Sequence, residues 1–207
     1  MNGQKPGKVV CVGRNYAAHA RELGKDVPER PLLFLKPSTA VIADGDAIVL
    51  PLQSQQVEHE GEIGIVIGTR ARAVSEAESL SVIAGYVPLN DVTARDLQKL
   101  DVQFTRAKGF DTFCPIGRMV PAQGIDWRSL EVTCHVNGQP RQHGAASEMV
   151  FGIPVIISYI SNIMTLEPGD VIATGTPEGV GPLQAGDVVE VELAGMSRVR
   201  NPVARMQ

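Results

Sequence analysis

Two glutamates that stand two residues apart have the spacing of a paired carboxylate site. Glu60 and Glu62 lie within residues 58–62 (EHEGE), which lead directly into the apolar residues 63–67. On a strand, side chains alternate between the two faces, so both glutamates would point the same way and His59 would face away from them. Because two neighbouring carboxylates at the entrance to a core repel each other, one must be neutral or a cation must lie between them. A solvated acidic face at a strand edge is the alternative.

Asp91 supplies a third carboxylate, at a predicted strand end. It follows the apolar run 82–89, and functional side chains often project from a rigid scaffold at such a position. With Glu60 and Glu62 it would give three hard oxygen ligands, which suit Mg²⁺ or Mn²⁺ and leave the remaining octahedral positions to water and substrate oxygens. Zinc is less favoured, because the one nearby histidine would face away. A helix N-cap near Thr93 is the alternative role for Asp91.

His19 and Glu22 stand three residues apart, which places both side chains on one face of a helix. A carboxylate beside an imidazole orients the ring and favours its protonated form, and a general base is often supported in this way. An ordinary ion pair at the surface would have the same spacing. The spacing alone therefore leaves both interpretations open.

One lysine and one loop could hold an anionic substrate. Lys108 lies among small and aromatic residues and could neutralise a carboxylate or a developing enolate; a solvated lysine is the alternative. Residues 174–181 (TGTPEGVG) follow a predicted strand but lack the Gly-Lys-Ser/Thr ending of a phosphate-binding loop. We therefore expect their backbone N–H groups and threonine hydroxyls to hold a carboxylate. His135 and His143 flank a predicted turn and need no catalytic role.

Short β-branched runs separated by turn residues dominate the chain and predict a mainly β (α+β) fold with hairpins. Asn137-Gly138 is the clearest turn. We expect helices at 15–23, 75–83 and 153–164; the second begins with the spacing of a capping box, and the third has a proline in its first turn. The runs that predict strands are 8–12, 47–50, 63–67, 130–136, 170–174 and 188–193.

Length and composition limit the class of protein. The chain has 207 residues, of which 43% are hydrophobic and 20% charged, and a formal net charge of −4. These values suit one domain with a sizeable core and exclude a disordered chain. No apolar run is long enough to span a bilayer, no secretory signal is visible, and no basic stripe favours nucleic acid. The widely spaced cysteines are expected to be reduced and buried: Cys11, Cys114 and Cys134.

These limits lead to three expectations about the whole chain. Residues 1–207 would form a single compact domain, with the N-terminal 40 residues as an appended lid or edge. The protein would be cytoplasmic. It would have neither a membrane nor a nucleic acid as a partner.

Six short segments occur in an order that is typical of one enzyme family: 13–16 (GRNY), 34–37 (FLKP), 59–62 (HEGE), 90–98 (NDVTARDLQ), 107–111 (AKGFD) and 174–177 (TGTP). Together they resemble the small single-domain members of the fumarylacetoacetate hydrolase (FAH) superfamily, over about residues 8–203. The resemblance implies a mixed β-roll or β-sandwich with a few peripheral helices. It also implies a homodimer, and a single catalytic domain over residues 1–207 in which residues 1–45 include a mobile lid helix at about 15–24.

The resemblance also assigns roles to particular residues. It implies that Mg²⁺ or Mn²⁺ is bound by three of them: Glu60, Glu62 and Asp91. It implies catalytic roles for three others, of which the first two activate water in family members with a mobile N-terminal lid: His19, Glu22 and Lys108. The positions that it implies for substrate binding are Arg14, Tyr16, Arg95, Gln98, Gly175 and Thr176.

The family shares one substrate logic, in which a 2-oxo acid chelates the metal and the cation stabilises an enolate at C3. We expect hydrolysis of an acylpyruvate, such as acetylpyruvate or fumarylpyruvate, to pyruvate and a carboxylic acid, because His19 and Glu22 could activate water. The stretch 99–107 is shorter than in the family's acylpyruvase and oxaloacetate decarboxylase members, and 113–117 resembles the 2-hydroxyhepta-2,4-diene-1,7-dioate isomerase branch. A decarboxylase or isomerase of aromatic catabolism is therefore an alternative. Outside enzymes, the alternative is a non-catalytic homologue that binds metal and a 2-oxo acid.

Overall fold

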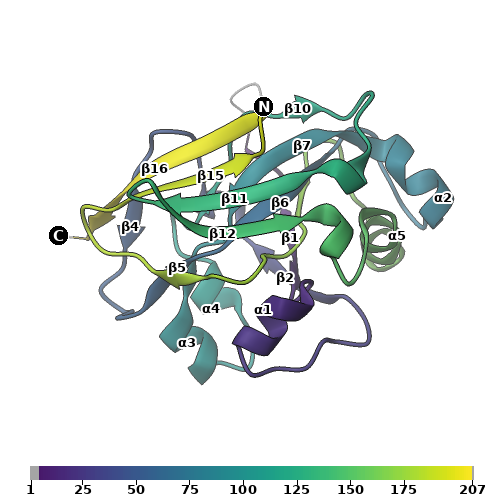
Figure 1. Ribbon diagram of the computed structural model, residues 1–207. Helices are drawn as coiled ribbons and strands as arrows, with labels where there is room; N and C mark the ends of the chain where they lie inside the picture. The colour runs from purple at the N-terminus through teal and green to yellow at the C-terminus, as the bar shows by residue number, and fades with distance from the viewer. Residues whose placement is uncertain (1–4, 207) are drawn as a thin grey trace.

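The computed structural model describes residues 5–206, which form mostly strands with short helices around them (Figure 1). The strands are β1 Val9–Gly13, β2 Leu32–Lys36, β3 Val41–Ile42, β4 Ile48–Leu50, β5 Val57–His59, β6 Gly61–Ile67, β7 Ile83–Asn90, β8 Thr93–Ala94, β9 Cys114–Pro115, β10 Val120–Pro121, β11 Glu131–Val136, β12 Gln139–Ala145, β13 Val171–Ala173, β14 Gly181–Pro182, β15 Val188–Leu193 and β16 Ser197–Arg205. The α-helices are α1 Ala17–Glu22, α2 Glu76–Ser79, α3 Arg95–Leu100, α4 Thr105–Lys108 and α5 Ile153–Ile163. The predicted mainly β fold is confirmed.

Two large mixed sheets pack against each other and enclose the main core. One has the strand order β10-β7-β6-β13-β1-β2 and the other β12-β11-β15-β16-β4. Strands β11, β15 and β16 of the second sheet contact β6 and β7 of the first, and apolar side chains fill the space between them. Smaller sheets, β14-β5-β8 and β3-β9, complete the roll-like architecture, which matches the fold expected from the family resemblance.

The antiparallel pairing of β6 with β7 positions the acidic residues. Gly61 of β6 lies opposite Asn90 of β7, so Glu60 and Asp91 stand just beyond the last paired residues of adjacent strands. The backbone N–H of Asp91 donates to the carbonyl of Glu60 across 2.8 Å, which continues the ladder by one hydrogen bond. Both residues therefore lie at the same end of the central sheet.

The predicted helices are present, with altered bounds. Residues 75–83 form α2 and a following 3₁₀ turn, and the capping box between Ser75 and Glu78 is confirmed. Helix α5 has Pro154 in its first turn, as expected. Helix α1 begins two residues later than the predicted 15–23, because the side chain of Asn15 is bound to the carbonyls of Phe151 and Thr174 and keeps the start of the segment extended.

The clearest predicted turn, Asn137-Gly138, joins β11 to β12, with φ angles of 53° and 74°. Of the two histidines beside it, His143 is exposed and pairs with Glu131 at 3.2 Å. His135 lies on β11, and neither histidine lines the cavity described below. The cysteines are buried and unpaired, as predicted.

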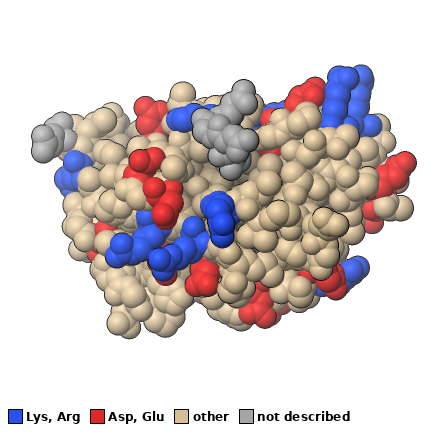
Figure 2. All heavy atoms as spheres, turned by 90° about the horizontal axis from the view of Figure 1, so that it is seen from above, with Lys and Arg blue, Asp and Glu red and all other residues tan. Residues whose placement is uncertain are grey.

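Acidic and basic side chains lie near one another among uncharged residues on the face shown in Figure 2. Within residues 5–206, no helix has both the length and the apolar character needed to cross a membrane. Helices α1, α3 and α4 gather at one end of the molecule, below the two sheets in Figure 1. The cavity that contains the predicted site lies among these helices and the strand ends above them.

Candidate active site

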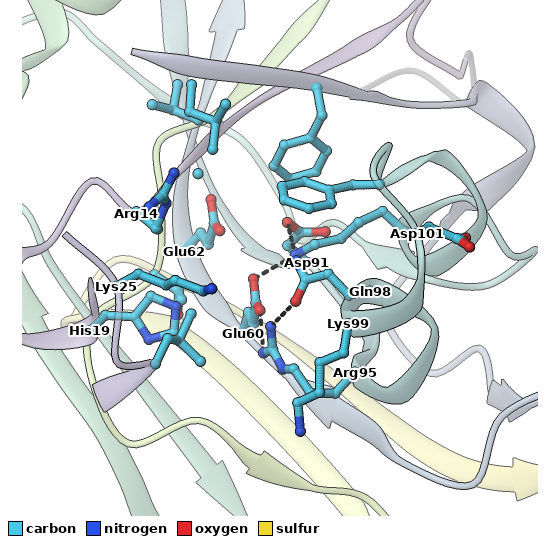
Figure 3. A pocket seen from close by; sticks show the side chains of 18 residues that line it. Arg14, His19, Lys25, Glu60, Glu62, Asp91, Arg95, Gln98, Lys99 and Asp101 are labelled. Atoms are coloured by element: carbon cyan, nitrogen blue, oxygen red, sulfur yellow. Dashed lines mark hydrogen bonds and ion pairs between the residues drawn. The ribbon is translucent and has the colours of Figure 1, made fainter. Parts of the chain in front are cut away.

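A cavity of about 630 Å³ brings together most of the residues predicted to do chemistry. Its walls come from the end of β1, the first half of β2, the start of β6, the residue that follows β7, and α1, α3 and α4. In Figure 3, His19 and Lys25 lie on the left, Arg95 and Gln98 lie on the right, and Glu60 stands between them, with Glu62 and Asp91 above it. The predicted residues that line it are Arg14, His19, Glu60, Glu62, Asp91, Arg95, Gln98, Lys108 and Thr176.

The three predicted metal ligands are brought together. Each of Glu60, Glu62 and Asp91 offers a carboxylate oxygen, these oxygens lie within 4.8 Å of one another, and all three residues are buried. The solvated acidic edge is wrong, because β6 is an inner strand that is covered on both sides. The N-cap role for Asp91 is also wrong, because α3 begins at Arg95 and Ala94 occupies the N-cap position.

Buried cations neutralise two of these carboxylates. Lys108 Nζ donates to Glu60 and to Asp91, in both cases across 2.7 Å, and Arg95 donates to Glu60 across 2.5 Å. Burial alone would raise the pKa of Glu60, but Lys108 and Arg95 hold it below its ordinary value. The solvated-lysine interpretation of Lys108 is wrong, since its side chain is 2% exposed.

Glu62 stands in a different electrostatic environment. Its carboxylate accepts a hydrogen bond from the backbone N–H of Gly175 at 2.7 Å, and within residues 5–206 it has no Lys or Arg nitrogen within 4.0 Å. Burial raises its pKa well above the ordinary value, and the charges of Asp91 and Glu60 raise it further. A divalent cation placed among the three carboxylates would supply the missing positive charge. The donor set of hard oxygens suits Mg²⁺ or Mn²⁺.

His19 lies buried at the cavity wall and pairs there with Glu22. Its Nδ1 lies 3.0 Å from Glu22 Oε2, the residue is 3% exposed, and it lines the cavity. The other carboxylate oxygen of Glu22 accepts from the backbone N–H of Gly179 at 3.0 Å. An ordinary surface pair is therefore the wrong interpretation for His19, although Glu22 itself is partly exposed. The arrangement fixes the ring with Nδ1 toward Glu22 and leaves Nε2 for another partner.

The predicted substrate-binding residues divide into two groups. Arg95 and Gln98 are joined by a hydrogen bond of 2.5 Å on α3, and Thr176 reaches the cavity from the loop after β13. Arg14 lines the cavity and donates to the carbonyl of Asp26. These four residues therefore line the same cavity as the three carboxylates.

Tyr16 and Gly175 are not brought to the cavity wall. Tyr16 pairs with Met149 through an isolated bridge, and its ring is buried in the main core. Gly175 gives its backbone N–H to Glu62 and lies behind the wall. The predicted direct contact of these two residues with substrate therefore finds no support in the geometry.

Sequence reasoning assigned no role to Lys36, which the structure places at the site. This last residue of β2 is 1% exposed, and its Nζ donates to Asp91 Oδ1 at 2.6 Å and to the carbonyl of Val92 at 3.0 Å. The signal was present: a lysine ends an apolar strand in the segment 34–37, one of the six that carry the resemblance. His59 is confirmed to face away, since it lines a separate hollow and bonds Gln142 at 3.0 Å.

Comparison with known proteins places this fold and its acidic cluster in one enzyme family. The family described as "Fumarylacetoacetate (FAA) hydrolase C-terminal" matches residues 8–204. The chain belongs to the fumarylacetoacetate hydrolase family. This confirms the resemblance of the six segments.

Relatives of the chain carry out different reactions. The mitochondrial oxaloacetate tautomerase FAHD1 of Bos taurus is 46% identical over 202 residues, which are 95% of this chain and 91% of that protein. A 5-carboxymethyl-2-hydroxymuconate delta-isomerase from Mycobacterium smegmatis is 46% identical, with a TM-score of 0.90 over 98% of this chain and 80% of that one. A fumarylpyruvate hydrolase from Pseudomonas aeruginosa, solved with Mn²⁺ and pyruvate, is 31% identical, with a TM-score of 0.91 over 97% of this chain and 91% of that one.

Proposed function

We propose that this chain is a divalent-metal-dependent enzyme that binds a 2-oxo acid and cleaves the C–C bond of an acylpyruvate by hydrolysis. The products would be pyruvate and a carboxylic acid. One observation carries the proposal: the buried His19 lines the same cavity as the three carboxylates, and Glu22 holds its ring there. A general base can activate water, and a cation bound beside it can stabilise an enolate.

Glu60, Glu62 and Asp91 would hold the metal, as Mg²⁺ or Mn²⁺. Bound there, such a cation supplies Lewis-acid stabilisation of negative charge on the 2-oxo group of the substrate. The structure supports this assignment, because the buried carboxylate of Glu62 is paired with no lysine or arginine within residues 5–206. The relative solved with Mn²⁺ and pyruvate supports it from the comparisons.

The remaining steps fall to the side chains of this chain. Arg95, Gln98 and Thr176 would orient the substrate carboxylate, because all three line the cavity with polar groups. His19 would take a proton from water, with Glu22 stabilising the imidazolium, while the water oxygen bonds to the distal carbonyl carbon. The C–C bond then breaks, its electron pair goes to C3 of the pyruvate enolate, and a proton returns to C3. The ammonium group of Lys108 would stabilise the enolate oxygen.

Keto–enol tautomerisation of oxaloacetate is a second candidate, favoured by the 46% identical tautomerase. The same residues would serve, with His19 moving a proton to or from C3 and no bond between carbons breaking. A decarboxylase or a dienedioate isomerase would also use the enolate. Decarboxylation requires no activated water, so it would not need the pair of His19 and Glu22.

Parallel assays separate these reactions. Acetylpyruvate cleavage, the decay of oxaloacetate enol absorbance, and pyruvate release from oxaloacetate would be followed with Mn²⁺, with Mg²⁺ and with EDTA. Metal-dependent cleavage of acetylpyruvate supports the hydrolase, whereas enol decay without pyruvate release supports the tautomerase. Binding of pyruvate without any turnover would contradict both and leave a binding protein.

The proposal includes two statements about the whole protein. We propose that it acts as a homodimer and that it is cytoplasmic. Light scattering of the purified chain tests the first statement, and a monomer at micromolar concentration would contradict it.

A further inference from the structure

Gly61 separates the two glutamates of the acidic cluster, and side chains hold both of its backbone polar groups. Its N–H donates to Gln142 Oε1 at 2.9 Å, and its carbonyl accepts from the hydroxyl of Thr176 at 2.9 Å. Gln142 Nε2 in turn donates to Thr176 Oγ1 at 2.7 Å. These three hydrogen bonds close a ring around the peptide groups between Glu60 and Glu62.

Gln142 uses its whole amide in this environment. Its Oε1 also pairs with His59 Nδ1 at 3.0 Å, and its Nε2 also donates to the carbonyl of Pro177 at 2.8 Å. The residue is 4% exposed. The amide orientation follows from the partners, because the N–H of Gly61 needs an acceptor and the carbonyl of Pro177 needs a donor. Loss of this amide would leave buried polar groups without partners, which is costly.

Gln142 lies on β12, and this strand also supports the loop that contacts Glu22, the partner of His19. A Cβ at Gly179 would lie 2.1 Å from the carbonyl oxygen of Arg141, so this part of the loop rests directly on the β12 backbone. Gly179 donates its N–H to Glu22, which holds His19. Gln142 is the next residue along β12. It therefore contacts Gly61 directly and adjoins the residue on which the loop at Gly179 rests.

We propose that Gln142 is a positioning residue of the active site: it fixes the segment that carries Glu60 and Glu62 against the loop that carries Thr176. Gln142 does not line the cavity, so it acts through the backbone of Gly61 and the hydroxyl of Thr176. The inference rests on the proposed metal-dependent function. It adds a residue to the site that no sequence motif pointed to.

Calorimetric titration with Mn²⁺ tests the proposal without turnover. Gln142→Leu should weaken Mn²⁺ binding by about 10- to 100-fold, as is typical when a hydrogen-bond partner behind a ligand is lost. The control is Gln139→Leu, an exposed glutamine on the same strand, which should bind Mn²⁺ like the wild type. Thermal unfolding in EDTA shows whether each variant is folded. A folded Gln142→Leu with wild-type Mn²⁺ affinity would overturn the proposal.

A second variant keeps the proposal testable if Gln142→Leu does not fold. Gln142→Glu retains an oxygen opposite the N–H of Gly61 but replaces the donor that serves Thr176 and Pro177. Pyruvate affinity, measured with Mn²⁺ saturating, should therefore fall by about tenfold or more; unchanged affinity in a folded variant would contradict the role. If the wild type binds Mn²⁺ and pyruvate but turns over no substrate, the proposed reaction fails while these binding tests still decide the role of Gln142.

Discussion

Lys36 Nζ donates to Asp91 Oδ1 across 2.6 Å, although 55 positions separate the two residues and neither side chain has more than 1% of its surface exposed. The pair places a positive charge on the side of Asp91 that Lys108 does not occupy. Two cations therefore flank one carboxylate at the floor of the cavity. These two cations offset carboxylate charge that would otherwise repel the organic acid proposed as substrate.

Lys36→Met should separate anion binding from cation binding. The change removes a positive charge from the site, so pyruvate affinity should fall by about tenfold or more while Mn²⁺ affinity should not fall. Calorimetry with each ligand measures both. The control is Lys8→Met, which breaks an ion pair with Asp170 away from the cavity and should leave pyruvate binding unchanged. Loss of Mn²⁺ binding in a folded Lys36→Met would show that the lysine instead supports the metal ligands.

Glu62→Gln should abolish Mn²⁺ binding and, in EDTA, stabilise the protein. Mn²⁺ would lose one of its three carboxylate ligands. Without metal, the change removes a buried carboxylate whose charge is repelled by Asp91 and Glu60, so the folded state becomes more stable. We expect a gain of about 1 kcal/mol, which is a rise of roughly 2–4 °C in Tm for a chain of this size. Glu58→Gln is the matched control: Glu58 is neutralised by Arg95 at 2.7 Å, so this change should lower Tm. Unchanged Mn²⁺ affinity in Glu62→Gln would place the metal elsewhere.

His19→Ala should lower acylpyruvate hydrolysis by about 10²- to 10⁴-fold, the usual contribution of a general base. Pyruvate release from oxaloacetate should be nearly unaffected, because decarboxylation needs no activated water. Steady-state assays of both substrates measure the two effects, with the exposed His143→Ala as control. Equal losses on the two substrates would mean that His19 holds the substrate instead of activating water.

Gly179→Ala should disturb hydrolysis through the loop. A Cβ here would lie 2.1 Å from the carbonyl oxygen of Arg141, so the N–H that holds Glu22 must move away. Because small misplacements near a base are costly, we expect kcat to fall by about 10²-fold while Mn²⁺ affinity is retained. Gly186→Ala is the control, since Gly186 has a similar φ of +96° but no atom within 4 Å of the added Cβ. If both variants lose activity alike, backbone strain and not the contact with Glu22 would be the cause.

Local pattern in the sequence predicted several parts of the site correctly. The two-residue period of a strand placed Glu60 and Glu62 on one side, and the helical spacing brought His19 next to Glu22. The same kind of local rule predicted the Asn137-Gly138 turn. These features depend on neighbours within a few residues, so backbone geometry alone is enough to specify them.

Contacts between distant segments could not be read from spacing. The meeting of Asp91 with Glu60 depends on the register of β6 against β7, and the burial of Lys36 depends on the end of β2 lying against Asp91. The family resemblance implies that Tyr16 contacts the substrate, but its side chain packs in the main core and does not line the cavity. None of these pairings leaves a periodic signal along the chain.

The sequence by itself therefore determined the chemical inventory: three carboxylates, a histidine with its own carboxylate, and the family in which they occur. Tertiary structure decided which charges share one cavity and which are neutralised. Burial is the physical reason, because Lys108 and Glu62 change from ordinary surface charges into strongly interacting groups only where water is excluded. The sheets and α4 create that dry environment, and no single segment of the chain contains it.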